Sequence, residues 1–427
     1  MATASTLPGT SAAFAIACGA PQVAVPEPRP RLAPAISGGL AVTVCQVLLA
    51  CVLTGCGNVA DAYLALYQGD GGWYADIASN GYHSPAQLDS SNYGNVAFFP
   101  GYPLGARIVH RLSGLPVPYA LLLTAQLGCW GFWSYVLLLF QRWRIEPSLA
   151  ALGVGLILVH PASFYLAASY SESHFLAATL GFIYWSDSRR KGSWLLAAVH
   201  GFVMTGTRLV GLPLVVYPLF HAWLNSEGRT TARLVRGALL AMAATLGTGL
   251  FFAYCQHLFG HWDLYMITNA AGWSVHPDYL GPFSMMIFHI HFPHHDEGFI
   301  DPEWVSRLSV PVMLFVFAGL FLAEGMLRLS RPEWDWRKRV GLYICAGLLF
   351  YIPAAGHFSR HMSSMIRFSL CVQAVLVPAF VHMLARARPL KRSPYAWAVP
   401  LLIAHGLVSF SLHLALTYRF VHGKWVA

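Results

Sequence analysis

Charged side chains stand at the borders of long apolar segments, and their types define the chemistry available to this chain. Asp70 and Glu172 are carboxylates that can accept a proton from a hydroxyl group. Arg208, Arg360 and Arg367 carry guanidinium groups, which can hold a phosphate through two parallel hydrogen bonds. These residue types favour proton abstraction beside an anion-binding group.

Asp70 opens a segment with the pattern of an amphipathic helix. Apolar and aromatic side chains follow it at helical spacing, and a glycine that can terminate the helix comes after them: Trp73, Tyr74, Ile77, Ala78 and Gly81. We expect this helix to lie on a membrane surface. Asp70 is then either its N-cap or a carboxylate held just above the bilayer.

Aromatic side chains near this helix are candidates for substrate binding, namely Trp73, Tyr74 and Tyr82. A second aromatic segment, residues 97–104, contains two prolines and precedes the next apolar run. This pattern is typical of interfacial anchors rather than of a membrane-spanning helix.

Glu172 and His174 lie at the start of an apolar segment, in Ser169-Tyr170-Ser171-Glu172-Ser173-His174. In one interpretation a serine caps the helix and Glu172 favours its dipole. In the other, both side chains face a wet cavity, because a carboxylate and a histidine are costly where a helix enters lipid.

The three arginines have the same two interpretations. Each side chain either reaches along the membrane toward water or faces a cavity and binds an anion. Positive charge is otherwise scarce on their predicted side of the membrane, which favours anion binding for Arg208, Arg360 and Arg367.

A metal site is not indicated, although a divalent metal stays open. The stretch from Phe288 to Glu297 holds four histidines and two carboxylates, which suit zinc or manganese. It lacks an HExxH order, and Pro293 interrupts it. The eight cysteines show no CxxC spacing and lie mostly in apolar segments, as small core residues do.

The elements that position these residues must be membrane helices. The chain of 427 residues is 56% hydrophobic and only 11% charged, so it needs lipid as its solvent. We predict about eleven spans. They are Ile36 to Gly57, Val117 to Phe140, Leu149 to Ala168, Phe175 to Trp185, Leu195 to Thr207, Leu209 to Trp223, Ala238 to His257, Val310 to Leu327, Val340 to Ala354, Ser369 to Leu384 and Ala396 to Thr417.

Basic residues sort into alternate loops, which is the positive-inside pattern. It predicts a multi-pass protein with a cytoplasmic N-terminus and with two long loops, residues 58–116 and 258–309, on the other side. We expect a bacterial plasma membrane rather than the endoplasmic reticulum. The basic residues behind the net charge of +9 therefore indicate membrane topology and not nucleic-acid binding.

The domain organisation is simple. Residues 1–34 are rich in alanine and proline without periodicity and are predicted to be a disordered cytoplasmic tail. Residues 35–427 form one transmembrane domain. The chain has no GxGxxG motif and no P-loop, so any function must be built from membrane helices and loops.

Four motifs, in order, resemble those of PIG-V-type mannosyltransferases, which are polytopic members of the GT-C glycosyltransferase superfamily. They are Gly69 to Tyr74 with Ile77-Ala78 and Gly81-Tyr82, then Ala97 to Pro103, then Ser169 to Phe175, then Thr207 to Gly211. The resemblance covers Tyr67 to Leu214. Beyond it, Arg367-Phe368 followed by Pro378 is similar to the family's late arginine–aromatic motif.

The resemblance implies an all-α, GT-C-like bundle with interfacial helices in its first outer loop. It also implies transfer of a mannose-like sugar, with inversion, from a polyprenyl or dolichyl phosphate in the membrane lipid to a hydroxyl of a glycan, glycolipid or protein acceptor outside the cytoplasm. Asp70 matches the family's proposed base, and Glu172 is an alternative base or orients the acceptor. The arginines would stabilise the departing phosphate. Gly69 replaces the aromatic residue usual before Asp70, which puts the local packing in question.

Two other functions stay open. A transporter or flippase of lipid-linked sugars predicts internal repeats and charges near the middle of the bilayer. An inactive GT-C-like subunit of a larger complex is kept open by the departure at Gly69.

Overall fold

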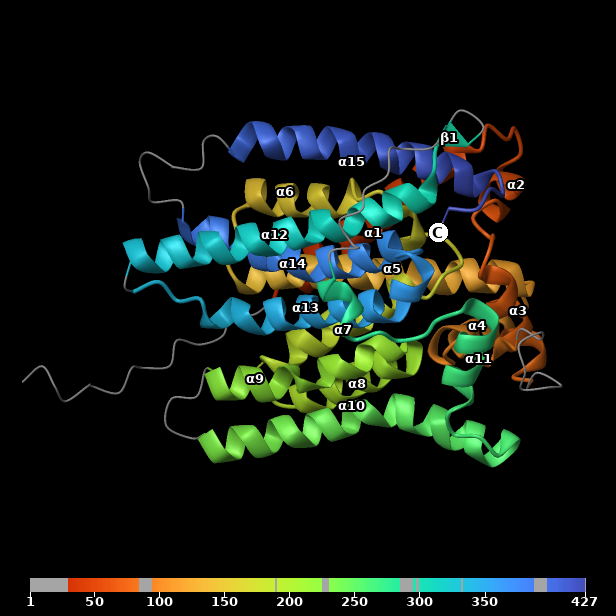
Figure 1. Ribbon diagram of the computed structural model, residues 1–427, viewed down its shortest axis with the longest axis horizontal. Helices are drawn as coiled ribbons and strands as arrows, with labels where there is room; N and C mark the ends of the chain where they lie inside the picture. The colour runs from red at the N-terminus through yellow and green to blue at the C-terminus, as the bar shows by residue number, and fades with distance from the viewer. Residues whose placement is uncertain are drawn as a thin grey trace, which may run out of the picture.

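Long helices run side by side along one axis, and several of the shorter helices lie at one end of the bundle (Figure 1). The computed structural model describes residues 30–83, 94–188, 190–224, 230–284, 295–296, 299–331, 333–387 and 398–426. The short helices α2, α3, α4 and α11 lie at the end that we call the loop end. Their position there shows that both predicted long loops contribute to the same end of the molecule.

The elements follow in chain order. The α-helices are α1 (Leu32–Leu53), α2 (Val59–Leu64), α3 (Gly71–Asn80), α4 (Gly101–Ser113), α5 (Val117–Arg142), α6 (Pro147–Leu158), α7 (Glu172–Ser186), α8 (Ser193–Thr207), α9 (Tyr217–Leu224), α10 (Thr230–Phe259), α11 (Leu264–Trp273), α12 (Pro302–Ser330), α13 (Arg337–His357), α14 (Met365–Ala387) and α15 (Ala398–Val421). The 3₁₀ turns are η1 (Asn95–Ala97), η2 (Ser163–Leu166), η3 (Leu209–Val216), η4 (Gly281–Phe283) and η6 (Phe358–Arg360), and a two-residue hairpin joins β1 (His295–Asp296) to β2 (Phe299–Ile300).

Six of the described helices are long and apolar enough to cross a membrane: α1, α5, α10, α12, α13 and α14. These helices make the chain an integral membrane protein, and the predicted all-α class is confirmed. Every predicted span overlaps one of the helices above. The number of crossings and the cytoplasmic side stay predictions.

The third predicted span is helical over only part of its length. Helix α6 ends at Leu158, and Pro161 follows in a turn that leads into η2. Proline cannot donate a backbone hydrogen bond and disfavours the helical conformation of the residue before it. The prediction of one helix up to Ala168 was therefore wrong, and the 3₁₀ turn brings Tyr165 close to the start of α7.

Close packing of α5 against α7 fixes the position of the α7 N-terminus. A Cβ atom on Gly128 would lie 2.8 Å from the backbone nitrogen of His174, so only glycine lets the two backbones approach this closely. The Ser173 hydroxyl also donates to the Ala125 carbonyl at 2.7 Å. The first turn of α7 is thus held at the loop end.

Two predictions fall outside the described residues. They are the predicted tail, of which only residues 30–34 are described, and most of the histidine-rich stretch, of which only His295 and Asp296 are described.

Candidate functional site

Four charged side chains from four elements meet at the loop end, and we call them the charged cluster: Asp70, Glu172, Arg208 and Arg367. Asp70 precedes α3, Glu172 starts α7, Arg208 follows α8, and Arg367 lies in the first turn of α14. The fold therefore brings together both predicted carboxylates and two of the three predicted arginines.

Asp70 occupies the position before α3, but its carboxylate makes no capping hydrogen bond to that helix. Its Oδ2 atom instead accepts a hydrogen bond from Nη1 of Arg367 at 2.8 Å. The Asp70 side chain is 27% exposed. Its carboxylate is thus directed toward the arginine and remains partly accessible.

Glu172 is fully buried and pairs with both guanidinium groups. Its Oε1 atom lies 2.6 Å from Nη1 of Arg208, 2.7 Å from Nη2 of Arg367 and 2.9 Å from Nε of Arg367. An unpaired charge in such a place would be very unfavourable, so Glu172 needs both partners to stay ionised. A favourable interaction of Glu172 with the helix dipole does not by itself account for these contacts.

Arg367 packs against two aromatic rings that we did not predict as site residues. Its guanidinium carbon lies 5.0 Å from the ring centre of Tyr165 and 4.7 Å from that of Tyr170. Both distances are within the range of cation–π attraction. Tyr170 belongs to the motif that contains Glu172, which was the available signal, whereas nothing in the sequence singled out Tyr165.

Tyr170 also explains the glycine before Asp70. Gly69 has φ +56°, and a Cβ atom at this position would collide with the Tyr170 hydroxyl. That hydroxyl accepts a hydrogen bond from the backbone N–H of Asp70 at 3.2 Å. The absence of an aromatic side chain at position 69 therefore leaves no gap, because an aromatic residue from another segment packs there.

Arg208 points into the protein rather than along the membrane surface. Its side chain is 14% exposed, and its guanidinium carbon lies 5.2 Å from the ring centre of Phe368. The backbone of Arg208 is extended, which ends α8 and separates it from η3. Of the two interpretations made from the sequence, this geometry agrees with a side chain that faces a site.

The candidate aromatic residues lie around α3 in different roles. Tyr74 is buried, and its hydroxyl lies 3.0 Å from that of Ser171, next to Glu172. Burial and the nearby carboxylates of Asp70 and Glu172 raise the pKa of Tyr74, so its hydroxyl stays protonated. Trp73 stacks on Phe98 with 5.9 Å between ring centres.

Tyr82 serves the packing of the loop end. Its hydroxyl donates to the Phe98 carbonyl at 2.7 Å, and its ring lies against Phe251 and Tyr254 of α10. The structure gives it no contact with the charged cluster.

The last two candidates, His174 and Arg360, also lie outside the charged cluster. His174 is mostly buried where α7 packs on α5, and Arg360 ends η6. None of the ion pairs that the structure gives for its described residues includes either side chain.

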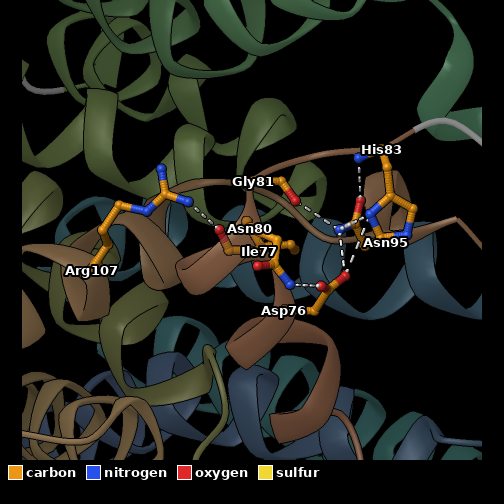
Figure 2. Close-up of polar contacts among 7 residues, drawn as sticks. All are labelled: Asp76, Ile77, Asn80, Gly81, His83, Asn95 and Arg107. Atoms are coloured by element: carbon orange, nitrogen blue, oxygen red, sulfur yellow. Dashed lines mark hydrogen bonds and ion pairs between the residues drawn. The ribbon is translucent and has the colours of Figure 1, made fainter.

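A network of polar contacts fixes the far end of α3 (Figure 2). The buried amide of Asn95 donates to Oδ2 of Asp76 at 2.8 Å and to the Gly81 carbonyl at 2.9 Å. Arg107 of α4 donates to the carbonyls of Ile77 and Ala78 at 2.8 and 2.6 Å. We call these side chains, Asp76, Asn95 and Arg107, the α3 clamp, and they hold the helix that follows Asp70.

An apolar groove of about 750 Å³ runs along α6, α12, α14 and α15. His160, Ile366 and Ser369 line the groove, and the last two flank Arg367 in the sequence. Leu327 and Ala387 line it as well, and they lie near the C-terminal ends of α12 and α14, whereas Arg367 lies near the start of α14. The groove thus extends from the level of the charged cluster along most of the bundle.

Within the part of the chain that the structure describes, no group of three or more histidine, cysteine or acidic side chains could hold a metal ion. The positive charge of the site comes from Arg208 and Arg367.

No protein-family model matches the chain, and no curated protein matches it. The solved structures that match the chain include the following two. One is the apo crystal structure of the Archaeoglobus fulgidus oligosaccharyltransferase, at 13% identity and a TM-score of 0.49, covering 89% of this chain and 56% of that chain. The other is archaeal oligosaccharyltransferase AglB from Archaeoglobus fulgidus in complex with an inhibitory peptide and a dolichol-phosphate, at 12% identity and a TM-score of 0.39, with the same coverage. The chain therefore spans little more than half the length of these proteins, and similarities at this level assign neither a family nor an activity.

Proposed function

We propose that this protein is a membrane glycosyltransferase that moves a mannose-like sugar from a polyprenyl or dolichyl phosphate to an acceptor hydroxyl. The observation that carries the proposal is the charged cluster, in which a partly exposed carboxylate lies 2.8 Å from an arginine. The resemblance of the motifs to PIG-V-type mannosyltransferases is the reason for naming mannose.

The proposed reaction uses each end of this ion pair. The Asp70 carboxylate takes the proton from the acceptor hydroxyl, and the oxygen of that hydroxyl forms a bond to the anomeric carbon of the donor. The bond from that carbon to the phosphate oxygen breaks, and its electron pair leaves with the lipid phosphate. Attack opposite to the leaving phosphate inverts the anomeric centre. Arg367 and Arg208 stabilise the charge that develops on the phosphate.

The groove supports a lipid as the carrier of the sugar. It is lined almost entirely by apolar side chains and includes residues that flank Arg367. A prenyl chain in this groove would place its phosphate at the level of the charged cluster. A long isoprenoid would exchange lipid contacts for contacts with the apolar side chains of this groove.

Glu172 is better suited to position the arginines than to act as the base. Its side chain is completely buried, and its Oε1 atom contacts both guanidinium groups. Its other oxygen, Oε2, is also buried, so a hydroxyl could reach this carboxylate only after surrounding side chains had moved. We therefore assign the base to Asp70 and the fixed geometry of the cations to Glu172.

The side of the reaction follows from the loops. Basic residues are scarce in the predicted loops of the loop end, so we propose that the site faces the periplasm or another non-cytoplasmic space.

The test uses purified protein in liposomes with polyprenyl-phosphate mannose labelled in the sugar. Acceptors are offered as separate pools of glycolipid, oligosaccharide and peptide. We expect label in one pool together with release of polyprenyl phosphate. Movement of the intact donor across the bilayer without glycoside formation would instead favour a flippase, and no change of the donor would favour an inactive subunit.

A further inference from the structure

We propose that the phosphate of the donor displaces Asp70 from Arg367 and thereby releases the base for catalysis. This inference rests on the proposed function, since it assigns an order of events to the same site. Without donor, the carboxylate and the arginine neutralise each other, and the base is not free to receive a proton.

The contacts of Arg367 are divided between two carboxylates in a way that allows one of them to be exchanged. Nε and Nη2 face Glu172, whereas Nη1 faces Asp70. Glu172 is fully buried, and Asp70 is 27% exposed. An anion that arrives from outside therefore reaches the Asp70 side of the guanidinium first.

Charge balance favours the same exchange. The charged cluster holds two arginines and two carboxylates, so its formal charge is zero. When Asp70 leaves Arg367, the remaining three groups carry one positive charge. A sugar phosphodiester of a lipid carries one negative charge, so its binding restores neutrality in a site that is poorly exposed to water.

The surrounding contacts would keep both partners near each other after the exchange. Arg367 stays packed against the rings of Tyr165 and Tyr170 and keeps its bonds to Glu172. The backbone N–H of Asp70 stays bonded to the Tyr170 hydroxyl at 3.2 Å. A rotation of the Asp70 side chain away from the phosphate, toward its exposed side, is then sufficient to free the carboxylate.

The experiment measures equilibrium binding of farnesyl methyl phosphate, a phosphodiester without a sugar, to the purified full-length protein. Asp70→Asn removes the competing charge, so we expect this variant to bind the probe about fivefold more tightly than the wild type. Asp61→Asn is the matched control, because Asp61 is an exposed carboxylate in α2, and its affinity should equal that of the wild type.

A second comparison tests whether the gain acts through Arg367. In an Arg367→Gln background, Asp70→Asn should change the affinity by less than about twofold, because the two positions are coupled only through this ion pair. Unchanged or weaker binding of the probe by Asp70→Asn in the wild-type background would overturn the displacement. That result would leave the proposed function standing if the wild type forms a glycoside. Tighter binding by Asp70→Asn in a protein that forms no glycoside would support the displacement and refute the transferase.

Discussion

At the scale of single residues, Glu172 is the carboxylate that pairs with both guanidinium groups of the charged cluster. A buried carboxylate is tolerated here because Arg208 and Arg367 approach the same oxygen at 2.6 and 2.7 Å. Removing one member of such a buried set costs about 3–5 kcal/mol, since the remaining charges stay buried without compensation. The positions of the four charged side chains therefore depend on one another.

Gly69 offers a test of how the residue before Asp70 is packed. Gly69→Ala places a Cβ atom against the Tyr170 hydroxyl at a backbone φ of +56°. We expect a loss of about 1–2 kcal/mol in the free energy of unfolding, seen as a lower melting temperature, together with reduced activity. Adding Tyr170→Phe removes the colliding hydroxyl and should restore part of the melting temperature.

The matched control is Gly72→Ala, where a Cβ atom would meet nothing within 4 Å and alanine favours the helix. This variant should be as stable as the wild type or more so. Equal melting temperatures for Gly69→Ala and the wild type would show that Tyr170 does not occupy this space.

The residue types of the site were predictable, but their partners were not. Asp70 and Arg367 lie 297 positions apart, and local spacing cannot show that their side chains meet. The N-cap interpretation of Asp70 was equally compatible with the sequence. His174 was selected because it lies two positions after Glu172. On a helix, positions two apart point in different directions, and the backbone of His174 packs against Gly128 of α5.

At the scale of elements, α3 has to be held at both ends for Asp70 to keep its place. At its start, the Asp70 N–H binds Tyr170, and at its end Arg107 donates to two carbonyls. A cation at a helix C-terminus also interacts favourably with the helix dipole.

Loss of the Arg107 contacts should loosen α3. Arg107→Ala removes two charge-assisted hydrogen bonds, so we expect the local stability of α3 to fall by about 1–2 kcal/mol. Hydrogen exchange of the α3 amides measures this loss and should become faster. Arg111→Ala, at an exposed position of the same helix α4, should leave the exchange unchanged. Identical exchange in both variants would show that the α3 clamp does not support this helix.

The elements themselves were largely predictable. Helix α3 was expected from the spacing of its aromatic and apolar residues, and Gly81 ends it as predicted. The end of α6 was missed, because hydropathy measures composition and does not respond to a single proline within an apolar run.

At the scale of the whole molecule, the bundle joins an apolar groove to a charged site. The groove runs along α12 and α14, and α14 also supplies Arg367. Hydropathy predicted that these helices are apolar, but it could not predict the groove, because a groove depends on how neighbouring helices pack.

Filling the groove should discriminate between donors of different chain length. Gly319 lines the groove, and a Cβ atom there would meet open space. Gly319→Trp should raise the KM for a long-chain polyprenyl donor about tenfold, because the prenyl chain loses apolar contacts, and should have little effect on a short-chain donor. Steady-state assays with both donors measure the difference.

The matched control for this prediction is Gly325→Trp, on the same helix but outside the groove. It should resemble the wild type with both donors. If Gly319→Trp affected long and short donors equally, the groove would not hold the prenyl chain.

The most direct test of the central claim is the rate of glycoside formation by wild type, Asp70→Asn and Asp61→Asn in the same liposomes. We predict one glycoside for each polyprenyl phosphate released, equal rates for wild type and Asp61→Asn, and a rate at least about 100-fold lower for Asp70→Asn because the general base is lost. Unchanged turnover by Asp70→Asn would contradict the assignment of Asp70 as the base and, with it, the proposed role of the charged cluster.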